Sequence, residues 1–518
     1  MKQKLKWDEL AGIFLATAGI GMLGVSVYLC FSGDIWYDEL FTMGLANQSL
    51  GGLISITAAD VHPPLYYMIV KLFLMMGTAL FGSVNQVVVA KLVSTLPFLL
   101  CMIYAIVKVR KHFGMLPAGL FCFLLPAMPK LADYTVEVRM YGFALFFILA
   151  GMLHAYEIAL DFQKISYVNW IALSFYALAA CYTHYFACVA SCMIYAYVLM
   201  TALIDRKGKQ ITKPFLTSGL ICVVGYLPWL STAVVSQVGT VKDNYWIQPL
   251  SLRTLGGCVK FLFMPALGND VLNIAAAALL FGIYAFLLVL FIRKQRHDGK
   301  KKSFFVFGSL GCLAGIVLFG FVASALVRPI FVYRYMLPAM GLFWLTFALL
   351  VAGLKGRKVL VIPLLFLLVL TGMRNYRSFY GEEMWKRVQM QKTQEALSVI
   401  EKDALLICNF NQVQAVVSSY LPNESLLWYG EPEELIVRMY PQNHSLVEGE
   451  FTDEAGIERL RELLMTGQPV WFLGSGNARE EILAKWEKEG ISAQETDSVL
   501  LERYWFNLYR IKSNFNNE

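Results

Sequence analysis

Two neighbouring acids, Asp38 and Glu39, stand in the stretch WYDEL, directly after an apolar run long enough to cross a bilayer. A second polar stretch, DVHPPLYY, begins at Asp60 and contains His62. Carboxylates and histidines are the side chains that most often move protons in catalysis. Because ionisable groups beside membrane spans are costly, they usually mark a site or a pathway. Their function depends on which side of the membrane they share.

The composition is that of a polytopic membrane protein. The chain has 518 residues, of which 58% are hydrophobic and 16% charged, and its mean hydropathy is +0.56. A soluble domain is usually about half apolar and about a quarter charged. The formal net charge of +7 comes mostly from short basic clusters between apolar runs. The distribution of these basic clusters indicates the membrane topology, because cytoplasmic loops are enriched in Lys and Arg. No nucleic-acid partner is expected.

Eleven apolar runs predict membrane-spanning helices, which need about 20 residues each. They cover roughly residues 10–31, 86–107, 115–129, 140–160, 168–186, 187–204, 214–233, 271–292, 304–326, 335–353 and 358–373. With a cytoplasmic N-terminus, the basic clusters fall in alternate, inside loops, as the positive-inside rule requires. The tail is then extracellular. The apolar stretch Pro63–Gly82 is expected to lie in the outer interface, because counting it as a span would invert the later loops.

This topology gathers the unusual polar residues at the outer face. One large outer loop, residues 32–85, holds both acidic stretches. Other candidates lie at the outer ends of the fourth span, the fifth and the tenth. The candidate site residues are Asp38, Glu39, Asp60, His62, Glu137, Arg139, His184 and Arg334. Their convergence on one face favours a site over scattered solvated loops.

Simpler interpretations of these residues stay open. His184 is also compatible with an interfacial histidine bonded to the backbone. Asp38 and Glu39 are compatible with a solvated helix start, although the flanking Trp36 and Phe41 argue against full solvation. On a helix, residues two positions apart do not face each other. An ion pair between Arg139 and Glu137 is therefore not expected, and Arg139 is expected to bind another anion.

Three motifs give the chain a family resemblance. They are WYDEL after the first span, DVHPPLYY from Asp60, and EVRMY from Glu137. In this order and on one side, they resemble the GT-C integral-membrane glycosyltransferases. The resemblance is to the group of protein O-mannosyltransferases and aminoarabinose transferases, glycosyltransferase family 39 and its bacterial relatives. It covers roughly residues 1–375 and implies a GT-C-like transmembrane catalytic domain.

The resemblance implies roles for several residues. Asp38 would be the catalytic base and Glu39 would orient the acceptor or the base. Arg139 would bind the donor phosphate, with Asp60, His62, Glu137, His184 and Arg334 as further donor or substrate contacts. No MIR-type domain, as found in the eukaryotic protein mannosyltransferases, stands between the spans, so a protein acceptor is not implied. The reaction expected is inverting transfer of a hexose or pentose from a polyprenyl-phosphate sugar to a glycan, lipid or protein acceptor at the outer face of the cell membrane.

The tail after residue 375 has a different composition. The stretches DALLICNF, ESLLWYG, PVWFLGS and ERYWFNLYRI are typical of strands, and EEILAKWEKEG is typical of a helix that ends at Gly490. Residues 376–518 are therefore predicted to form an extracellular, soluble α/β domain. Its GSGN turn, from Gly474, has the form of an anion-binding turn, but an ordinary strand-to-helix turn explains it as well.

Other functions remain as alternatives. The ten cysteines show no CxxC pair or Cys/His cluster, so neither zinc nor redox chemistry is supported. Asp60 and His62 can supply two ligands to a divalent cation, which is fewer than a site requires. The main alternative is a lipid-linked-sugar flippase or another transporter, for which inverted repeats and broken helices would be expected. The sequence shows no such repeat.

Overall fold

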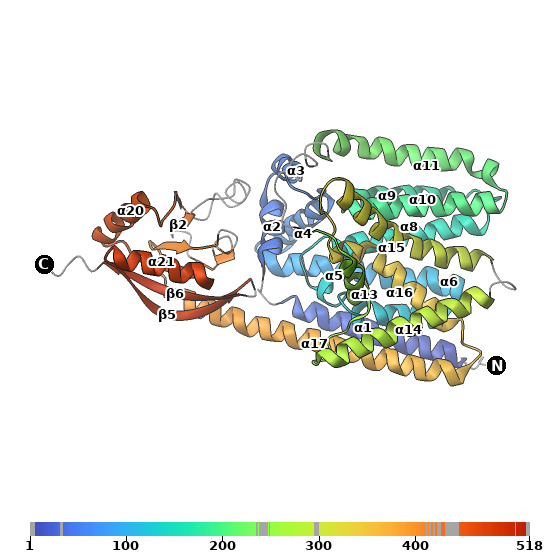
Figure 1. Cartoon of the computed structure of the whole chain (residues 1–518). Coiled ribbons are helices and arrows are strands. Elements are labelled where there is room, and N and C mark those ends of the chain that lie inside the picture. The colour runs from blue at the N-terminus through green and yellow to red at the C-terminus, as the bar shows by residue number, and fades with distance from the viewer. Residues whose placement is uncertain are drawn as a thin grey trace. The chain divides into compact units, whose positions relative to one another are not determined.

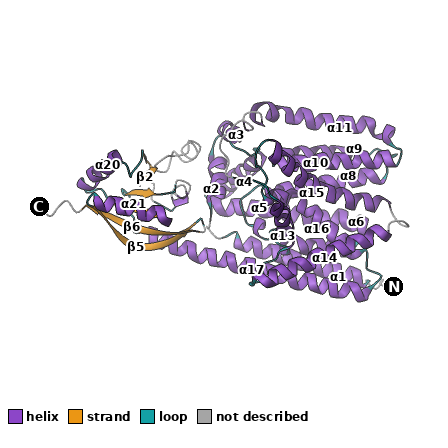
Figure 2. Cartoon of the chain, viewed as in Figure 1, coloured by secondary structure: helices purple, strands orange, loops and turns teal. Residues whose placement is uncertain are grey.

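A computed structural model describes residues 6–31, 35–234, 237, 247, 249–294, 300–410, 413, 416–417, 420–421, 426–429, 445–502 and 504–513. Helices make up most of this part of the chain, and its strands all lie after residue 404 (Figure 2). The chain divides into two compact units. The membrane unit comprises Met1–Phe31 and Leu50–Gly381, and the C-terminal unit comprises Ser32–Ser49 and Glu382–Glu518.

The membrane unit is a bundle of helices that run side by side (Figure 1). Among the described residues, nine helical runs are long and apolar enough to cross a membrane. Their main helices are α1 (Trp7–Leu29), α5 (Gln86–Tyr104), α8 (Tyr141–Leu160), α10 (Tyr185–Ile204), α11 (Gly208–Trp229), α14 (Asp270–Lys294), α15 (Lys300–Leu326), α16 (Leu337–Ala352) and α17 (Lys358–Leu397). The run that starts with α5 continues through a π-helical turn, Ala105–Val109, into α6 (Arg110–Phe113). The polytopic helical fold is thus confirmed.

Two of the eleven predicted spans are short helices. These are α7 (Met115–Ala127), with 13 residues, and α9 (Tyr167–Cys181), with 15 residues. Both are shorter than the roughly 20 residues of a typical span. All eleven predicted runs nevertheless coincide with helices.

Close backbone contact explains how the short α7 packs. A Cβ atom on Gly19 of α1 would lie 2.2 Å from the carbonyl oxygen of Cys122 in α7, and one on Gly119 would lie 1.8 Å from that of Gly12. Small residues let membrane helices approach until their backbones touch. The glycines therefore seat α7 against α1, where 12 of its 13 residues are buried.

Three further helices connect the long ones. They are α3 (Leu50–Ala59), α4 (Leu65–Phe81) and α13 (Leu252–Phe263). Pro64 is the residue before the first helical position of α4, as the Pro-Pro pair predicts. A helix, α4, is thus found where the interfacial segment Pro63–Gly82 was expected, and its depth in a membrane stays a prediction.

Basic side chains gather at one end of the bundle. In the last turns of α8, the Glu157 carboxylate lies 2.6 Å from the Lys108 amine, 3.3 Å from the Lys111 amine and 2.9 Å from the His112 imidazole. Arg139 precedes the start of α8, so it lies at the other end of a helix that is about 30 Å long. We call the end at which α8, α10 and α16 begin the site end.

The C-terminal unit contains a mixed sheet with strand order β3-β2-β1-β4-β6-β5. The strands are β1 (Leu405–Cys408), β2 (Leu426–Tyr429), β3 (Ser445–Glu448), β4 (Val470–Gly474), β5 (Ile491–Leu501) and β6 (Tyr504–Ser513). The first four are parallel, and β5 and β6 form an antiparallel hairpin. Helices α20 (Glu454–Met465) and α21 (Gly476–Lys488) belong to the same unit.

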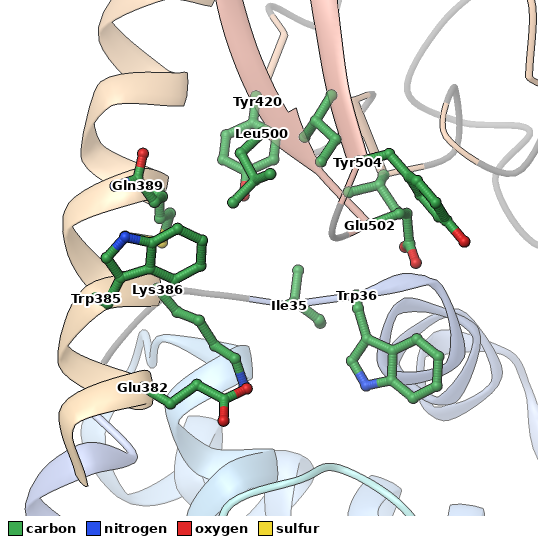
Figure 3. A pocket seen from close by; sticks show the side chains of 13 residues that line it. Ile35, Trp36, Glu382, Trp385, Lys386, Gln389, Tyr420, Leu500, Glu502 and Tyr504 are labelled. Atoms are coloured by element: carbon green, nitrogen blue, oxygen red, sulfur yellow. The ribbon is translucent and has the colours of Figure 1, made fainter. Parts of the chain in front are cut away.

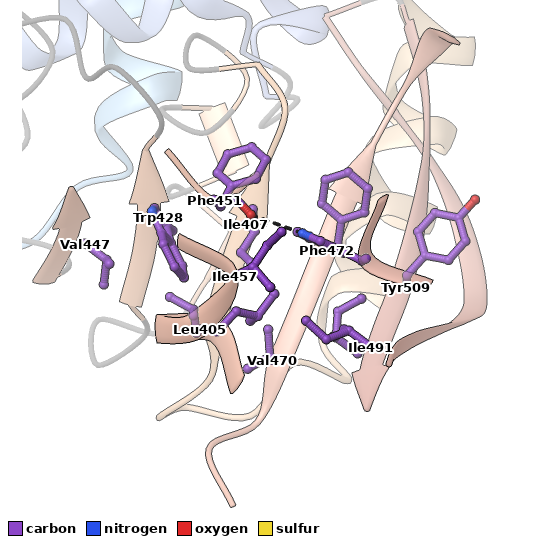
Figure 4. Close-up of a cluster of buried hydrophobic side chains, with 13 residues drawn as sticks. Leu405, Ile407, Trp428, Val447, Phe451, Ile457, Val470, Phe472, Ile491 and Tyr509 are labelled. Carbon is purple, nitrogen blue, oxygen red and sulfur yellow. Dashed lines mark hydrogen bonds between the residues drawn. The ribbon is translucent and has the colours of Figure 1, made fainter. Parts of the chain in front are cut away.

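A hydrophobic core holds this sheet to its helices. Leu405, Val470 and Phe472 from the central strands pack with Ile457 of α20 (Figure 4). Leu460 of α20 and Trp486 of α21 belong to the same core. The Trp486 indole N–H donates to the Phe451 carbonyl at 3.1 Å, so its one polar atom is satisfied. Strands buried on both faces read as continuous apolar runs. This is why β1 and β4 were predictable from sequence, and the predicted α/β architecture is confirmed.

Two features of the chain's division differ from a simple split after residue 375. Helix α17 has 40 residues and continues without a break across that position. The helix α2 (Tyr37–Asn47), which carries both acids of WYDEL, belongs to the C-terminal unit. The predicted outer loop 32–85 is therefore shared between the two units, and the domain bounds 1–375 and 376–518 stay a prediction.

Candidate active site

A cluster of basic side chains lies at the site end of the membrane unit. His62 lies in the turn between α3 and α4, Arg139 just before α8, His184 just before α10, and Arg334 in the 3₁₀ turn Tyr333–Met336 before α16. An Arg139 guanidinium nitrogen lies 3.3 Å from the His62 Nε2 atom, and the His62 and His184 ring centres are 6.0 Å apart. We call these four residues the basic cluster.

Backbone contacts fix the turns that carry the two histidines. The Leu65 N–H, at the start of α4, donates to the Tyr182 carbonyl at 3.0 Å. This bond holds the DVHPP turn against the turn between α9 and α10. Pro63 and Pro64 restrict the backbone between His62 and α4. The sequence places the two histidines far apart, and this contact brings them together.

Arg139 lies in a loop rather than on a helix. Its backbone N–H donates to the Glu137 carbonyl at 2.8 Å, which closes a tight turn immediately before α8. The helical spacing used to separate Glu137 from Arg139 is therefore the wrong geometry. The Arg139 side chain is only 5% exposed. A buried guanidinium needs compensating acceptors, because its desolvation is costly.

The two histidines of the cluster are uncharged at neutral pH. Burial lowers the pKa of His62 well below its usual value, and the Arg139 guanidinium lowers it further. Burial likewise lowers the pKa of His184 to about 3, with Arg139 and Arg334 adding to the shift. The positive charge of the basic cluster thus belongs to its two arginines.

His184 presents one hydrogen-bond donor into the cluster. Its Nδ1 atom accepts from the Phe186 N–H at 3.2 Å, so the side chain caps the start of α10. A neutral imidazole whose Nδ1 accepts carries its proton on Nε2. That Nε2 atom is buried and has no hydrogen-bond partner among the described residues. The interfacial interpretation of His184 is thus half correct, because only one nitrogen serves the backbone.

Tyrosines surround His184, and the motifs contained them without marking them as site residues. The Tyr141 and Tyr335 rings lie 5.4 Å and 5.1 Å from the His184 ring centre. Tyr134 stacks edge-on against Tyr141 at 5.2 Å, and burial raises the pKa of Tyr134 well above its ordinary value. Neutral phenols are hydrogen-bond donors. Tyr141 ends EVRMY and Tyr335 follows Arg334, so motif position was the available signal.

Asp60 and His62 share one short turn. The Asp60 N–H donates to the Ile56 carbonyl at 3.0 Å, which ends α3. Within the described part of the chain, no group of three or more His, Cys, Asp or Glu side chains is arranged to hold a metal ion. His62 Nε2 faces the Arg139 guanidinium, and that arrangement disfavours a cation at this nitrogen.

Asp38 and Glu39 lie in the first turn of α2, in the C-terminal unit. Glu39 is 4% exposed, and its carboxylate accepts from the Trp36 N–H at 3.2 Å. This is the reciprocal half of a capping box, which fixes the start of a helix. Asp38 is half-buried, and its carbonyl accepts from the Thr42 hydroxyl at 3.1 Å. The neighbouring acids therefore have different surroundings, and Glu39 maintains the turn that carries Asp38.

The GSGN turn is satisfied by its own unit. The Asn409 side chain donates to the Ser475 carbonyl at 2.9 Å and accepts from the Ser475 N–H at 3.2 Å. The Ser475 hydroxyl donates to the Trp505 carbonyl at 2.7 Å. These bonds favour the ordinary strand-to-helix turn between β4 and α21 over an anion site.

Two solved structures have a fold similar to that of this chain. The chain matches ArnT from Cupriavidus metallidurans in the apo state with 11% identity and a TM-score of 0.56, covering 96% of this chain and 97% of that one. ArnT bound to undecaprenyl phosphate matches with 12% identity and a TM-score of 0.57 over the same shares. ArnT is a GT-C transferase. This chain has the GT-C fold.

Only the fold follows from these likenesses, because the identities are low. No protein-family model matches the chain, and no curated protein matches it by sequence. A weaker likeness, with 10% identity and a TM-score of 0.46, is to the oligosaccharyltransferase of Archaeoglobus fulgidus in complex with Zn and sulfate, covering 90% of this chain and 67% of that one. The GT-C fold thus gives the setting in which the basic cluster is interpreted.

Proposed function

We propose that this protein is an inverting glycosyltransferase that moves a sugar from a polyprenyl-phosphate donor to an acceptor hydroxyl or other nucleophile. The observation that carries the proposal is the basic cluster at one end of a GT-C bundle. Two arginines and a buried imidazole N–H that has no partner within the described residues are the groups expected around a phosphate. ArnT, which shares the fold, has been crystallised with undecaprenyl phosphate.

The basic cluster is suited to a leaving phosphate. Arg139 offers planar, forked donors that match phosphate oxygens, and Arg334 adds a second positive charge. The neutral His184 adds an N–H donor without requiring a proton from solution. As the bond between the anomeric carbon and the phosphate breaks, negative charge grows on the phosphate. Donors already in place stabilise that charge without reorganisation.

Asp38 is proposed as the general base. The acceptor oxygen attacks the anomeric carbon, the carbon–phosphate oxygen bond breaks, and the acceptor proton passes to the Asp38 carboxylate. Polyprenyl phosphate leaves with the bonding electrons. A single displacement inverts the anomeric centre, so no second carboxylate needs to act as nucleophile. Glu39 orients the turn that carries Asp38, as its capping bond suggests.

The donor explains why the site would face away from the cytosol. A site on the outer face is separated from cytosolic nucleotide sugars, whereas a lipid carrier delivers a sugar to that face. The basic residues at the opposite end of the bundle fit a cytoplasmic end by the positive-inside rule. The protein is therefore proposed to act at the outer face of the cell membrane, on a glycan, lipid or protein acceptor. A divalent cation at Asp60 and His62 stays a prediction, and no step depends on it.

The test is sugar transfer from synthetic polyprenyl-phosphate donors by purified protein. Asp38→Asn keeps the size and polarity of the side chain but cannot take the proton. General-base catalysis contributes about 10²–10⁴-fold, so turnover should fall at least 100-fold while donor affinity changes little. Glu39→Gln is the matched control, since glutamine also serves in a capping box. Full activity in Asp38→Asn would exclude this mechanism. Donor translocation that survives Asp38→Asn without any transfer would favour a flippase.

A further inference from the structure

The C-terminal unit contains a cavity of about 480 Å³ next to the start of α2. It is bounded by the part of α17 in this unit, by the β5–β6 turn, and by Ile35 and Trp36, which precede α2 (Figure 3). Pockets of about 300–1,000 Å³ are typical of small-molecule sites. The cavity belongs to neither the basic cluster nor the GSGN turn.

Aromatic side chains dominate the walls of this cavity. Trp385 of α17 and Trp36 lie on opposite sides, and Tyr420 and Tyr504 close other parts of the rim (Figure 3). Trp385 is 49% exposed and Tyr504 is 67% exposed. Large aromatic rings gain most from burial, so exposed rings that converge on one cavity indicate a contact surface.

Charged groups line the same cavity. The Lys386 amine lies 2.6 Å from the Glu383 carboxylate and 3.6 Å from that of Glu382, and Lys386 and Glu382 line the floor below Trp385 (Figure 3). The Glu502 carboxylate lies on the opposite wall, beside Tyr504 (Figure 3). With two carboxylates and one amine, these lining charges sum to about −1. They disfavour a phosphate or an anionic lipid headgroup, and they offer several partners for neutral hydroxyl groups.

We propose that this cavity binds a saccharide portion of the acceptor, an inference that rests on the proposed function. A sugar ring has an apolar face of C–H groups and a rim of hydroxyls. The C–H face suits the electron-rich faces of indole and phenol rings, and the hydroxyls suit carboxylates and an ammonium group. Trp36 and Trp385, with Glu382, Lys386 and Glu502, supply both kinds of contact in one space.

The position of the cavity connects it to the proposed base. Trp36 lines the cavity and stands two positions before Asp38 in the sequence. Glu502 lines it too, and its carboxylate accepts a hydrogen bond from the Tyr37 N–H. A saccharide held against Trp36 is therefore held next to the first turn of α2. This placement suits an acceptor, whose hydroxyl must reach Asp38.

The test is saccharide binding to the purified full chain in lipid nanodiscs, free of sugar-based detergent. The probes are the methyl glycosides of glucose, galactose, mannose and N-acetylglucosamine, observed by saturation-transfer NMR. We expect at least one probe to bind to the wild type, and Trp385→Ala to weaken its binding about tenfold, as the loss of one stacking ring predicts. Trp505→Ala should leave binding unchanged, because Trp505 is also exposed, at 56%, and does not line the cavity.

Two outcomes would overturn the inference: no probe binds, or Trp385→Ala and Trp505→Ala behave alike. If Trp385→Ala fails to fold, Tyr504→Ala, at another lining ring, decides by the same comparison. The measurement needs no donor, so it reports saccharide binding separately from sugar transfer. Transfer activity without probe binding would contradict only the proposed saccharide site. Probe binding without transfer from any donor would contradict the proposed glycosyltransferase function.

Discussion

The carboxylate of Glu502 accepts a hydrogen bond from the backbone N–H of Tyr37, the first residue of α2, across a sequence separation of 465 residues. Leu501 pairs with Tyr504 across the β5–β6 hairpin, and Glu502 in the tight turn between them has a φ of +52°. Two-residue hairpin turns require such left-handed conformations. The hairpin thus holds a carboxylate at the end of α2 that carries Asp38, where the helix dipole favours negative charge.

Loss of this contact should lower the rate of transfer. Glu502→Ala leaves the Tyr37 N–H without its acceptor, and a misplaced catalytic group costs up to about 100-fold in rate. We expect kcat to fall at least about tenfold, with donor binding unchanged. Glu502→Gln keeps a carbonyl acceptor and should be milder. Equal kcat in wild type and Glu502→Ala would show that the hairpin does not position α2.

Arg139 should govern the use of the donor. Arg139→Lys keeps the charge but loses the planar fork, and charged hydrogen bonds contribute about 1.5–3 kcal/mol. We expect the donor KM to rise about tenfold or more in Arg139→Lys and further in Arg139→Ala. Arg253→Ala, at an exposed arginine of α13, is the control and should behave as the wild type. Unchanged donor kinetics in both Arg139 variants would remove Arg139 from the site.

Acidification should destabilise the protein through its buried histidines. The folded-state pKa of His184 is about 3, below the ordinary value near 6.5 that an unfolded chain would have. The unfolded state therefore binds the proton first, so the stability that this group contributes is complete above about pH 6.5 and declines as pH falls toward 3. His62 adds a shift of the same sign.

The measurement is the thermal unfolding midpoint in nanodiscs between pH 7.5 and 5. His184→Asn removes the titrating ring while keeping a side chain that caps helices well. Its midpoint should fall less on acidification than that of the wild type. When the midpoints are converted to free energies of unfolding, the slopes of the two proteins against pH should differ by about 1.4 kcal/mol per pH unit below pH 6. Parallel curves would mean that His184 titrates normally.

Close packing between α1 and α7 can be tested with two neighbouring glycines. Gly19→Ala brings a Cβ within 2.2 Å of the Cys122 carbonyl oxygen, whereas a Cβ at Gly21 meets nothing within 4 Å. Overpacking typically costs about 1–3 kcal/mol. Gly19→Ala should therefore lower the unfolding midpoint, and Gly21→Ala should leave it near the wild-type value. Equal midpoints would contradict the contact.

Sidedness can be measured with reporter fusions. An alkaline phosphatase fused after Glu518 should be active, because the C-terminal unit is predicted to be extracellular. The same reporter fused after Lys111, at the end of the bundle opposite the site end, should be inactive. A cytoplasmic fluorescent reporter should show the reverse pattern. An inactive fusion after Glu518 together with an active one after Lys111 would reverse the proposed orientation.

Elements with local signals could be predicted from the sequence. Length and apolarity located the long helices, because a bilayer imposes a minimum run of apolar residues. The Pro-Pro pair predicted the start of α4, and the continuous apolar runs at β1 and β4 predicted buried strands. Strand β5 was missed, because its residues Ala493–Ser498 are largely polar and exposed and carry little apolar signal.

The contacts between distant turns come from packing and could not be predicted from the sequence. His62, Arg139, His184 and Arg334 come from four separate turns, and nothing in their spacing fixes the 3.3 Å contact between Arg139 and His62. Burial, which also comes from packing, leaves the histidines neutral. Likewise the bond from Tyr37 to Glu502 places α2 with the C-terminal unit, although the chain around it belongs to the membrane unit. Such contacts join residues far apart along the chain, so local propensity and periodicity carry no information about them.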